Sequence, residues 1–127
     1  MDWELIPNEG IPALKLGDDK AMVRARFGEP RIFRRTQDSP EADQFTGSGM
    51  LVTYGLDEKV VFIELTHPSN PIIRGSVLLG QRLSQVLDSL VRDGISAVTD
   101  NEGASIVGWR VGLYAPSGTI EGVSVGE

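Results

Sequence analysis

The stretch LGQRLSQVLDSLVRDG, residues 79–94, decides the fold because it encodes an amphipathic helix with a defined end. Polar residues such as Gln85 and Asp88 occupy one side of this helix. Gly94 supplies the left-handed residue that commonly ends a helix. The apolar residues recur at intervals of three and four, which predicts one buried stripe formed by Leu83, Val86, Leu87, Leu90 and Val91.

The same pattern occurs earlier in the chain and predicts an internal duplication. At an offset of 63, Leu16, Gly17, Val23 and Phe27 match Leu79, Gly80, Val86 and Leu90. At an offset of 60, Leu51, Tyr54, Val60, Ile63 and Leu65 match Val111, Tyr114, Ile120, Val123 and Val125. The alternative is that these matches arose by chance, since these residue types are common. The duplication places one repeat at about residues 16–65 and the other at about 79–125, within a single domain spanning 1–127.

The first copy of the helix is short and has signals at both ends. Asp18 or Asp19 is placed to cap its N-terminus by accepting backbone N–H bonds. Gly28 ends the helix, and Pro30 prevents it from resuming. Such a short helix depends on packing for its stability, and not on propensity alone.

Runs rich in β-forming residues follow each helix, and we expect strands at 31–35, 50–54, 59–65, 95–99, 110–115 and 119–125. Residues 37–49 and 66–75, rich in Pro, Gly, Ser and Asp, are expected to be connections. The predicted fold is α+β: two tandem α-β-β repeats form an antiparallel sheet with both helices packed on one face. Its core contacts join Val23, Phe27, Val86, Leu87 and Leu90 of the helices to Ile63, Leu65, Val123 and Val125 of the sheet.

The composition excludes several classes of chemistry. Cysteine is absent, which removes disulfides, thiolate metal sites and cysteine nucleophiles, and His67 is the one histidine. The net charge of −6 repels a phosphate backbone, so we expect no nucleic-acid partner. No run is apolar enough to cross a membrane, and the acidic start Met1-Asp2-Trp3-Glu4 differs from a basic secretory signal. These features predict a cytoplasmic protein without membrane association.

The positive charge is concentrated in one part of the sequence. Between Lys20 and Arg35 there are six bases and one acid, a local charge of +5, so the rest of the chain carries −11. Arg24 and Arg26 fall in the last turn of a helix, where the dipole favours cations. The remaining three arginines form the predicted partner-binding patch, suited to an anionic protein surface: Arg31, Arg34 and Arg35.

Other candidate residues have simpler interpretations. The pair Asp18-Asp19 lacks further acids at calcium-binding spacing and suits helix capping. A lone histidine beside a proline, His67, is typical of a turn residue. Trp3 and Trp109 are expected to pack against the core, although an exposed tryptophan would also anchor an interface.

Two short motifs and the tandem layout carry resemblances to known families. Leu16-Gly17, Val23 and Phe27-Gly28-Glu29-Pro30 resemble a helix of the small outer-membrane-assembly lipoproteins, although the cysteine for lipid attachment is missing. The tandem layout is similar to that of β-lactamase-inhibitory proteins, which double a related unit. Trp3-Glu4-Leu5-Ile6-Pro7 with Gly10-Ile11 resembles short bacterial proteins, some of which serve as immunity proteins to secreted toxins. These resemblances imply an inhibitory or immunity role and transfer no catalytic residue.

The expected function is that of a non-enzymatic bacterial module that binds a protein partner, with no catalytic residue, metal or organic cofactor. Toxin immunity is the most specific version of this expected function. The alternative is a small enzyme or small-molecule-binding domain in which the fold pairs scattered carboxylates, such as Glu64 and Asp57, for acid–base chemistry.

Overall fold

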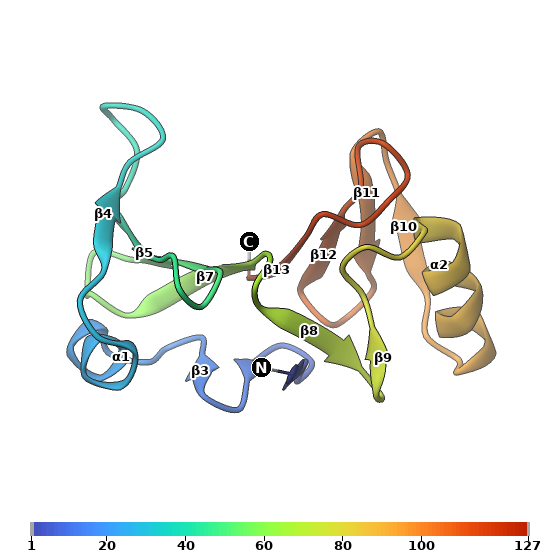
Figure 1. Cartoon of the computed structure of the whole chain (residues 1–127), viewed down its shortest axis with the longest axis horizontal. Coiled ribbons are helices and arrows are strands. Elements are labelled where there is room, and N and C mark those ends of the chain that lie inside the picture. The colour runs from blue at the N-terminus through green and yellow to red at the C-terminus, as the bar shows by residue number, and fades with distance from the viewer. Residues whose placement is uncertain (1, 127) are drawn as a thin grey trace.

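A computed structural model describes residues 2–126 and shows a mixed α+β protein whose strands are mostly antiparallel (Figure 1). Its main element is an eight-stranded sheet in which all neighbouring strands pair antiparallel. In spatial order the strands are β10 (Ala97–Thr99), β11 (Gly103–Ile106), β12 (Val111–Tyr114), β13 (Gly122–Gly126), β7 (Val60–Leu65), β6 (Met50–Tyr54), β5 (Ala42–Phe45) and β4 (Arg31–Phe33).

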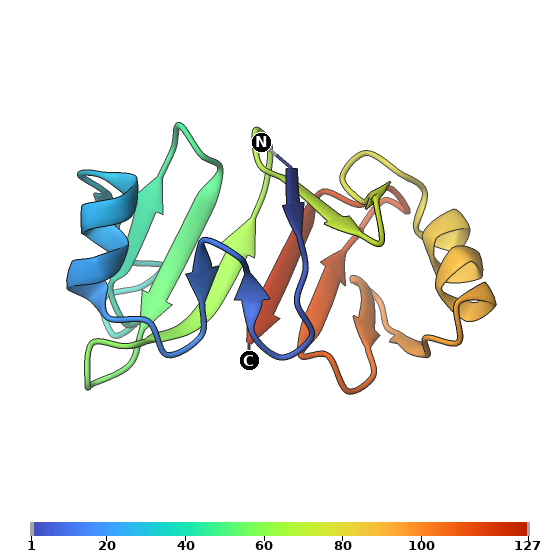
Figure 2. The same cartoon turned by 90° about the horizontal axis from the view of Figure 1, so that it is seen from below.

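Two helices and two small sheets complete the described structure. The helices are α1 (Lys20–Phe27) and α2 (Leu83–Arg92). One small sheet contains β1 (Asp2–Glu4), β8 (Asn70–Ile73) and β9 (Ser76–Val77), and the other contains β2 (Gly10–Ile11) and β3 (Leu14–Lys15). Seen from below, the small sheets lie in front of the middle of the large sheet and the helices lie toward its two ends (Figure 2). Neither helix is long and apolar enough to cross a membrane.

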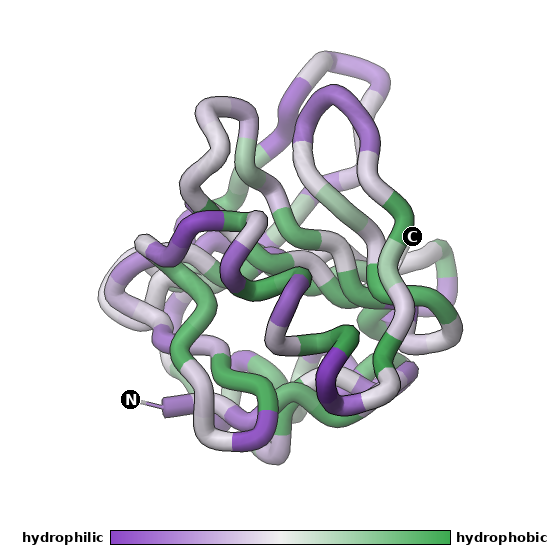
Figure 3. Tube along the Cα trace, turned by 90° about the vertical axis from the view of Figure 1, so that its right-hand side faces the viewer, coloured by the Kyte–Doolittle hydropathy of each residue, from purple (hydrophilic) through white to green (hydrophobic). Residues whose placement is uncertain are grey.

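The core lies between the large sheet and this second layer. Strands β7 and β13 meet at the centre of the sheet, where Leu65 pairs with Val123 and Ile63 with Val125. All four side chains are at most 2% exposed. Because side chains alternate along a strand, their neighbours Glu64 and Ser124 point to the opposite face. Hydrophobic and hydrophilic stretches follow one another along the chain trace (Figure 3).

The predicted core residues belong to one apolar cluster. Val23, Val86 and Leu90 are buried in the same apolar cluster as the four central strand residues, and Phe27 and Leu87 pack against it partly buried. The predicted stripe is wrong at Val91, which is 69% exposed. Helix α2 presents a narrower side to the core than the sequence periodicity suggests.

The small sheets cover the middle of the large sheet on the side of the helices, and the sequence analysis did not predict them. Short segments from the N-terminus and from the connection between β7 and α2 insert apolar side chains there. Each of these side chains is at most 3% exposed: Leu5, Ile11, Leu14, Ile73 and Leu78.

Each helix is followed by four strands of the large sheet, and not by the predicted α-β-β unit. Segments 37–49 and 66–75, predicted as connections, contain β5 and β8, and β11 was not predicted. In β5 the inward-facing residue Asp43 is polar, so the sequence of this strand does not show the usual alternation of apolar and polar residues. Strand β11 begins with a glycine and an alanine, which are uncommon in strands.

The two helices begin in equivalent ways. Before the first helix, the Gly17 N–H donates to the Val60 carbonyl at 2.8 Å, and before the second, the Gly80 N–H donates to the Ile120 carbonyl at the same distance. Gly80 lies 63 residues after Gly17, and Ile120 lies 60 residues after Val60. The predicted cap is wrong in its chemistry. Asp19 occupies the N-cap position without a side-chain capping bond, and its carboxylate accepts a hydrogen bond from Lys59 Nζ at 2.6 Å. The Asp18 carboxylate accepts from the Lys15 N–H at 2.9 Å, outside the helix.

Replacing Leu90 by alanine tests the packing of α2. The side chain is 3% exposed, so we expect Leu90→Ala to lower the free energy of unfolding by about 2–5 kcal/mol. Val91→Ala on the same helix turn should change it by less than about 0.5 kcal/mol, because that side chain is already in water. Chemical denaturation measures both, and equal losses would contradict the assigned helix face.

Candidate functional site

The face of the large sheet opposite the helices carries the candidate site. No helix or strand of residues 2–126 covers it, and loops rise at both ends (Figure 1). At one end is the loop between β4 and β5, and at the other are the loops joining β10 to β11 and β12 to β13. We call this surface the outer face. Its outward positions, set by strand register and alternation, include Arg31, Phe33, Gln44, Leu51, Phe62, Glu64, Ser124, Tyr114, Ser105 and Val98.

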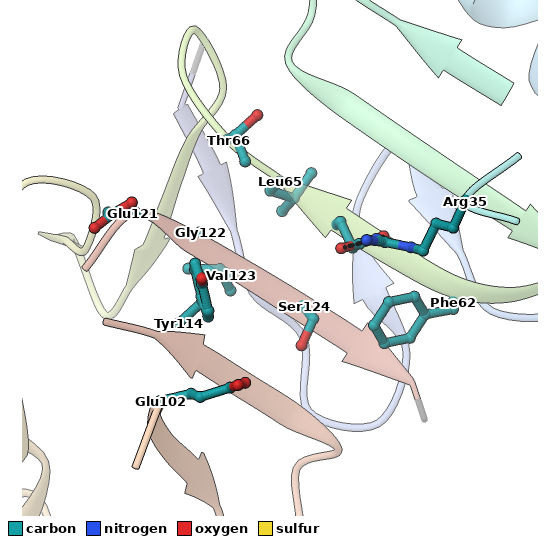
Figure 4. A pocket seen from close by; sticks show the side chains of 11 residues that line it. Arg35, Phe62, Leu65, Thr66, Glu102, Tyr114, Glu121, Gly122, Val123 and Ser124 are labelled. Atoms are coloured by element: carbon teal, nitrogen blue, oxygen red, sulfur yellow. Dashed lines mark hydrogen bonds and ion pairs between the residues drawn. The ribbon is translucent and has the colours of Figure 1, made fainter. Parts of the chain in front are cut away.

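The outer face is hollowed over its centre. A groove of about 600 Å³ lies over β7, β13 and β12 (Figure 4). It is lined by Arg35, Phe62, Glu64, Leu65, Thr66, Glu102, Tyr114, Glu121, Gly122, Val123 and Ser124. We call it the central groove. A smaller hollow beside it shares Glu64 and Thr66 and reaches His67.

Small residues keep the floor of the central groove low. Next to it on β12, a side chain at Gly112 would place its Cβ 2.7 Å from Ser124 Oγ, so the Ser124 side chain would have to rotate away. At Gly122, within the groove, an added Cβ would lie 3.6 Å from Thr66 Cγ2, an ordinary contact. The absence of a side chain at Gly122 therefore leaves space in the groove that a small side chain would occupy.

Arg35 closes one end of the central groove. Its Nη2 donates to both carboxylate oxygens of Glu64, at 2.7 and 2.6 Å, although the two residues are 29 positions apart. The guanidinium also lies 5.9 Å from the centre of the Phe33 ring. An exposed pair of this kind adds at most about 1 kcal/mol to stability. It does, however, neutralise the Glu64 carboxylate at the centre of the face.

The other end of the groove is acidic. Glu102, just before β11, extends toward Ser124, and Glu121 lies just before β13 (Figure 4). Neither forms an ion pair with any base in residues 2–126, and both residues are exposed. Ser117 Oγ lies 3.3 Å from one Glu121 oxygen. Between the two acids stands Tyr114, which is 50% exposed.

The three predicted partner-binding arginines lie at the β4 end of the outer face, but they do not form one free patch. Strand β4 ends at Phe33, so the expectation that Arg34 and Arg35 continue it is wrong. Arg34 pairs with Glu41 at 2.7 Å, and Arg35 pairs with Glu64. Arg31 is exposed and forms no ion pair within the described residues. Their role in binding a partner stays a prediction.

Arg24 lies on the covered side of the sheet, in a buried polar network that the sequence analysis missed. Its Nε and Nη2 each donate to Asp43 at 2.8 Å, and Tyr54 Oη donates to the same carboxylate at 2.9 Å. Asp43 is 2% exposed. An aspartate between an alanine and a glutamine gives no signal of burial in the sequence, which is why the network could not be predicted.

The network shifts two pKa values. Burial, reinforced by the hydrogen bond to Asp43, raises the pKa of Tyr54 far above its usual value near 10. The hydrogen bonds to Asp43 raise the pKa of Arg24. Both shifts favour the protonated forms that hold α1 against β5 and β6. The network therefore stabilises the packing of α1 on the sheet.

The remaining candidates are dispersed. Asp57 lies in the turn between β6 and β7, where its side chain accepts a bond from the Lys59 N–H, and it is not among the residues of the central groove with Glu64. Trp3 and Trp109 pack against the core, as expected. Within residues 2–126 no three side chains of the metal-binding types gather closely enough to hold a metal ion.

Comparisons with family models, with curated proteins and with solved structures find no match for this chain.

Removing the Arg24 guanidinium tests the buried network. We expect Arg24→Met to lower the free energy of unfolding by about 3 kcal/mol, the lower end of the range for breaking a buried pair, since the Arg24 side chain is 38% exposed. A second change, Asp43→Asn in the same protein, should restore part of the loss because it removes the unpaired buried charge. Urea denaturation measures both, and no recovery in the double variant would contradict the pairing.

The pKa shift of Tyr54 predicts an alkaline loss of stability. A raised folded pKa means that the native state holds the phenol proton after the unfolded chain releases it at about pH 10. Stability is therefore full below that pH and falls as the pH rises through the folded pKa. Tyr54→Phe should be less stable by about 1 kcal/mol at neutral pH and should lose less stability above pH 10. Parallel curves of unfolding free energy against pH for the two proteins would contradict this assignment.

Proposed function

We propose that this protein is a non-enzymatic binding module that recognises a protein partner through its outer face, with toxin immunity or inhibition as its sharpest form. One observation carries the proposal: a broad sheet face, hollowed at its centre and bounded by loops at both ends, has no covering layer among the described residues. A sheet packed on one side is a rigid platform, and a rigid platform limits the entropy lost when a partner binds.

The chemistry of the outer face also supports protein recognition. Tyr114, Phe62 and Phe33 supply aromatic surface at or near the central groove, and aromatic residues are enriched in protein interfaces. Charge differs between the ends, with Arg31 at one and Glu102 and Glu121 at the other. Such an arrangement favours one orientation of a charged partner.

We further propose that the chain arose by duplication, as in the inhibitory proteins that its layout resembles. The offsets of 63 and 60 residues in the sequence recur in the hydrogen bonds at the two helix starts. Strands β7 and β13, each the last of its half, pair at the centre of the sheet. A doubled unit yields a wider face than one copy, and a wide face suits a protein partner.

A second candidate function is favoured by one observation: three carboxylates, Glu64, Glu102 and Glu121, line the central groove. A small-molecule-binding or acid–base role would use them. The groove is open to solvent, however, and Glu64 is paired with Arg35, whereas a general acid or base works best in an enclosed site that shifts its pKa. We therefore rank this alternative below protein recognition.

Affinity capture with matched variants tests the proposal. The wild-type protein is used to isolate partners from an extract of the organism that carries the gene. Arg31→Glu and Ser105→Arg change exposed positions at the two ends of the outer face without removing a native ion pair. We expect both to reduce recovery of the wild-type partner at least about tenfold, a loss of about 1.4 kcal/mol.

The controls make the same changes on exposed positions of α2, as Arg92→Glu and Gln85→Arg. They should retain the partner. Equal recovery by all four variants, or loss in the α2 variants alone, would contradict binding through the outer face. Immunity additionally requires that the captured partner be a toxin whose activity this protein blocks, and a non-toxic partner would contradict that form of the proposal.

A further inference from the structure

We infer that the central groove receives a lysine or arginine side chain from a protruding segment of the protein partner. The inference rests on the proposed function and adds the chemistry of the contact to it. It concerns the part of the groove between Glu102, Tyr114 and Glu121, which lies at the end away from Arg35 (Figure 4).

Charge complementarity identifies the occupant. Of the three groove carboxylates, Glu64 is already neutralised by Arg35, whereas Glu102 and Glu121 have no basic partner in the described part of the chain. The whole chain carries a net charge of −6, which adds to the local negative potential. An anionic group placed here would meet two unpaired carboxylates, so the groove favours a cation.

The shape and apolar surface of the groove select a long side chain. The hollow of about 600 Å³ is open to solvent, so the backbone of a partner segment can remain outside while a side chain enters. Tyr114 offers a half-exposed ring in this part of the groove. An aromatic face stabilises a cation lying over it, and the methylene stem of Lys or Arg packs against the same surface.

A bare metal ion fits the groove poorly. Residues 2–126 bring no three carboxylate or imidazole groups within reach of a common ion. The two acids instead stand at different edges of the groove, one before β11 and one before β13. A guanidinium has several N–H donors and can bond acids on more than one side, whereas a compact ion needs its ligands around one point.

The test is a titration of the isotope-labelled full-length protein, followed by the amide resonances of its two-dimensional NMR spectrum. The probes are the capped tripeptides Gly-Arg-Gly, Gly-Lys-Gly and Gly-Glu-Gly at low ionic strength. The Arg and Lys peptides should shift the amides near Glu102, Tyr114 and Ser124 saturably, with a Kd on the order of 1–10 mM. The Glu peptide should not, and raising the salt to about 0.5 M should weaken the cationic probes.

Neutral variants identify the groups responsible. We expect E102Q/E121Q to weaken binding of the Arg peptide at least about fivefold, and its spectrum reports directly whether the fold is intact. Asp88→Asn removes an exposed acid on α2 and is the matched control, so it should bind as the wild type does. Absence of saturable shifts in the groove, equal binding of the Glu peptide, or unchanged binding by E102Q/E121Q would each overturn the inference.

The outcomes separate this inference from the function on which it rests. If the outer-face variants lose the captured partner but the cationic peptides do not bind, protein recognition stands and the cationic occupant is wrong. If the peptides bind the groove while the outer-face variants retain the partner, the groove binds cations but the proposed function is wrong.

Discussion

The antiparallel pairing of β7 with β13 is the interaction on which the rest of the structure depends. It joins the strands of the two halves of the chain into one eight-stranded sheet. On the covered side, Ile63, Leu65, Val123 and Val125 form the centre of the core. On the outer face, the residues that alternate with them form the floor of the central groove. Weakening this pairing would therefore divide both the core and the candidate site.

The sequence predicted the core more fully than the edges of the fold. Regular apolar spacing identified α2, β6, β7 and most of the central core residues, because burial on one side of a helix or strand imposes a period. The small sheets could not be predicted, since strands such as β2 and β3 contain two residues each and show no period. Strand β5 was hidden because Asp43 occupies an inward position that an apolar residue would normally take.

The candidate site was only partly predictable for a related reason. The concentration of bases between Lys20 and Arg35 suggested one patch, but the fold distributes them to different partners. Arg24 bonds Asp43 beneath the sheet, and Arg35 bonds Glu64 above it. Glu102 and Glu121 lie just outside strands β11 and β13, where no periodic pattern marks them. The strand order brings these two acids to the same groove, and this placement could not be deduced from local sequence.

The central claim is that the outer face, and not the helical side, contacts the partner. Photocrosslinking tests it most directly, with benzoylphenylalanine placed at Tyr114 in one protein and at Val91 in another. Both side chains are at least half exposed, so either position accepts the probe without disturbing the core. The account predicts a covalent adduct with the captured partner from position 114 and none from position 91. An adduct from position 91 alone would contradict it.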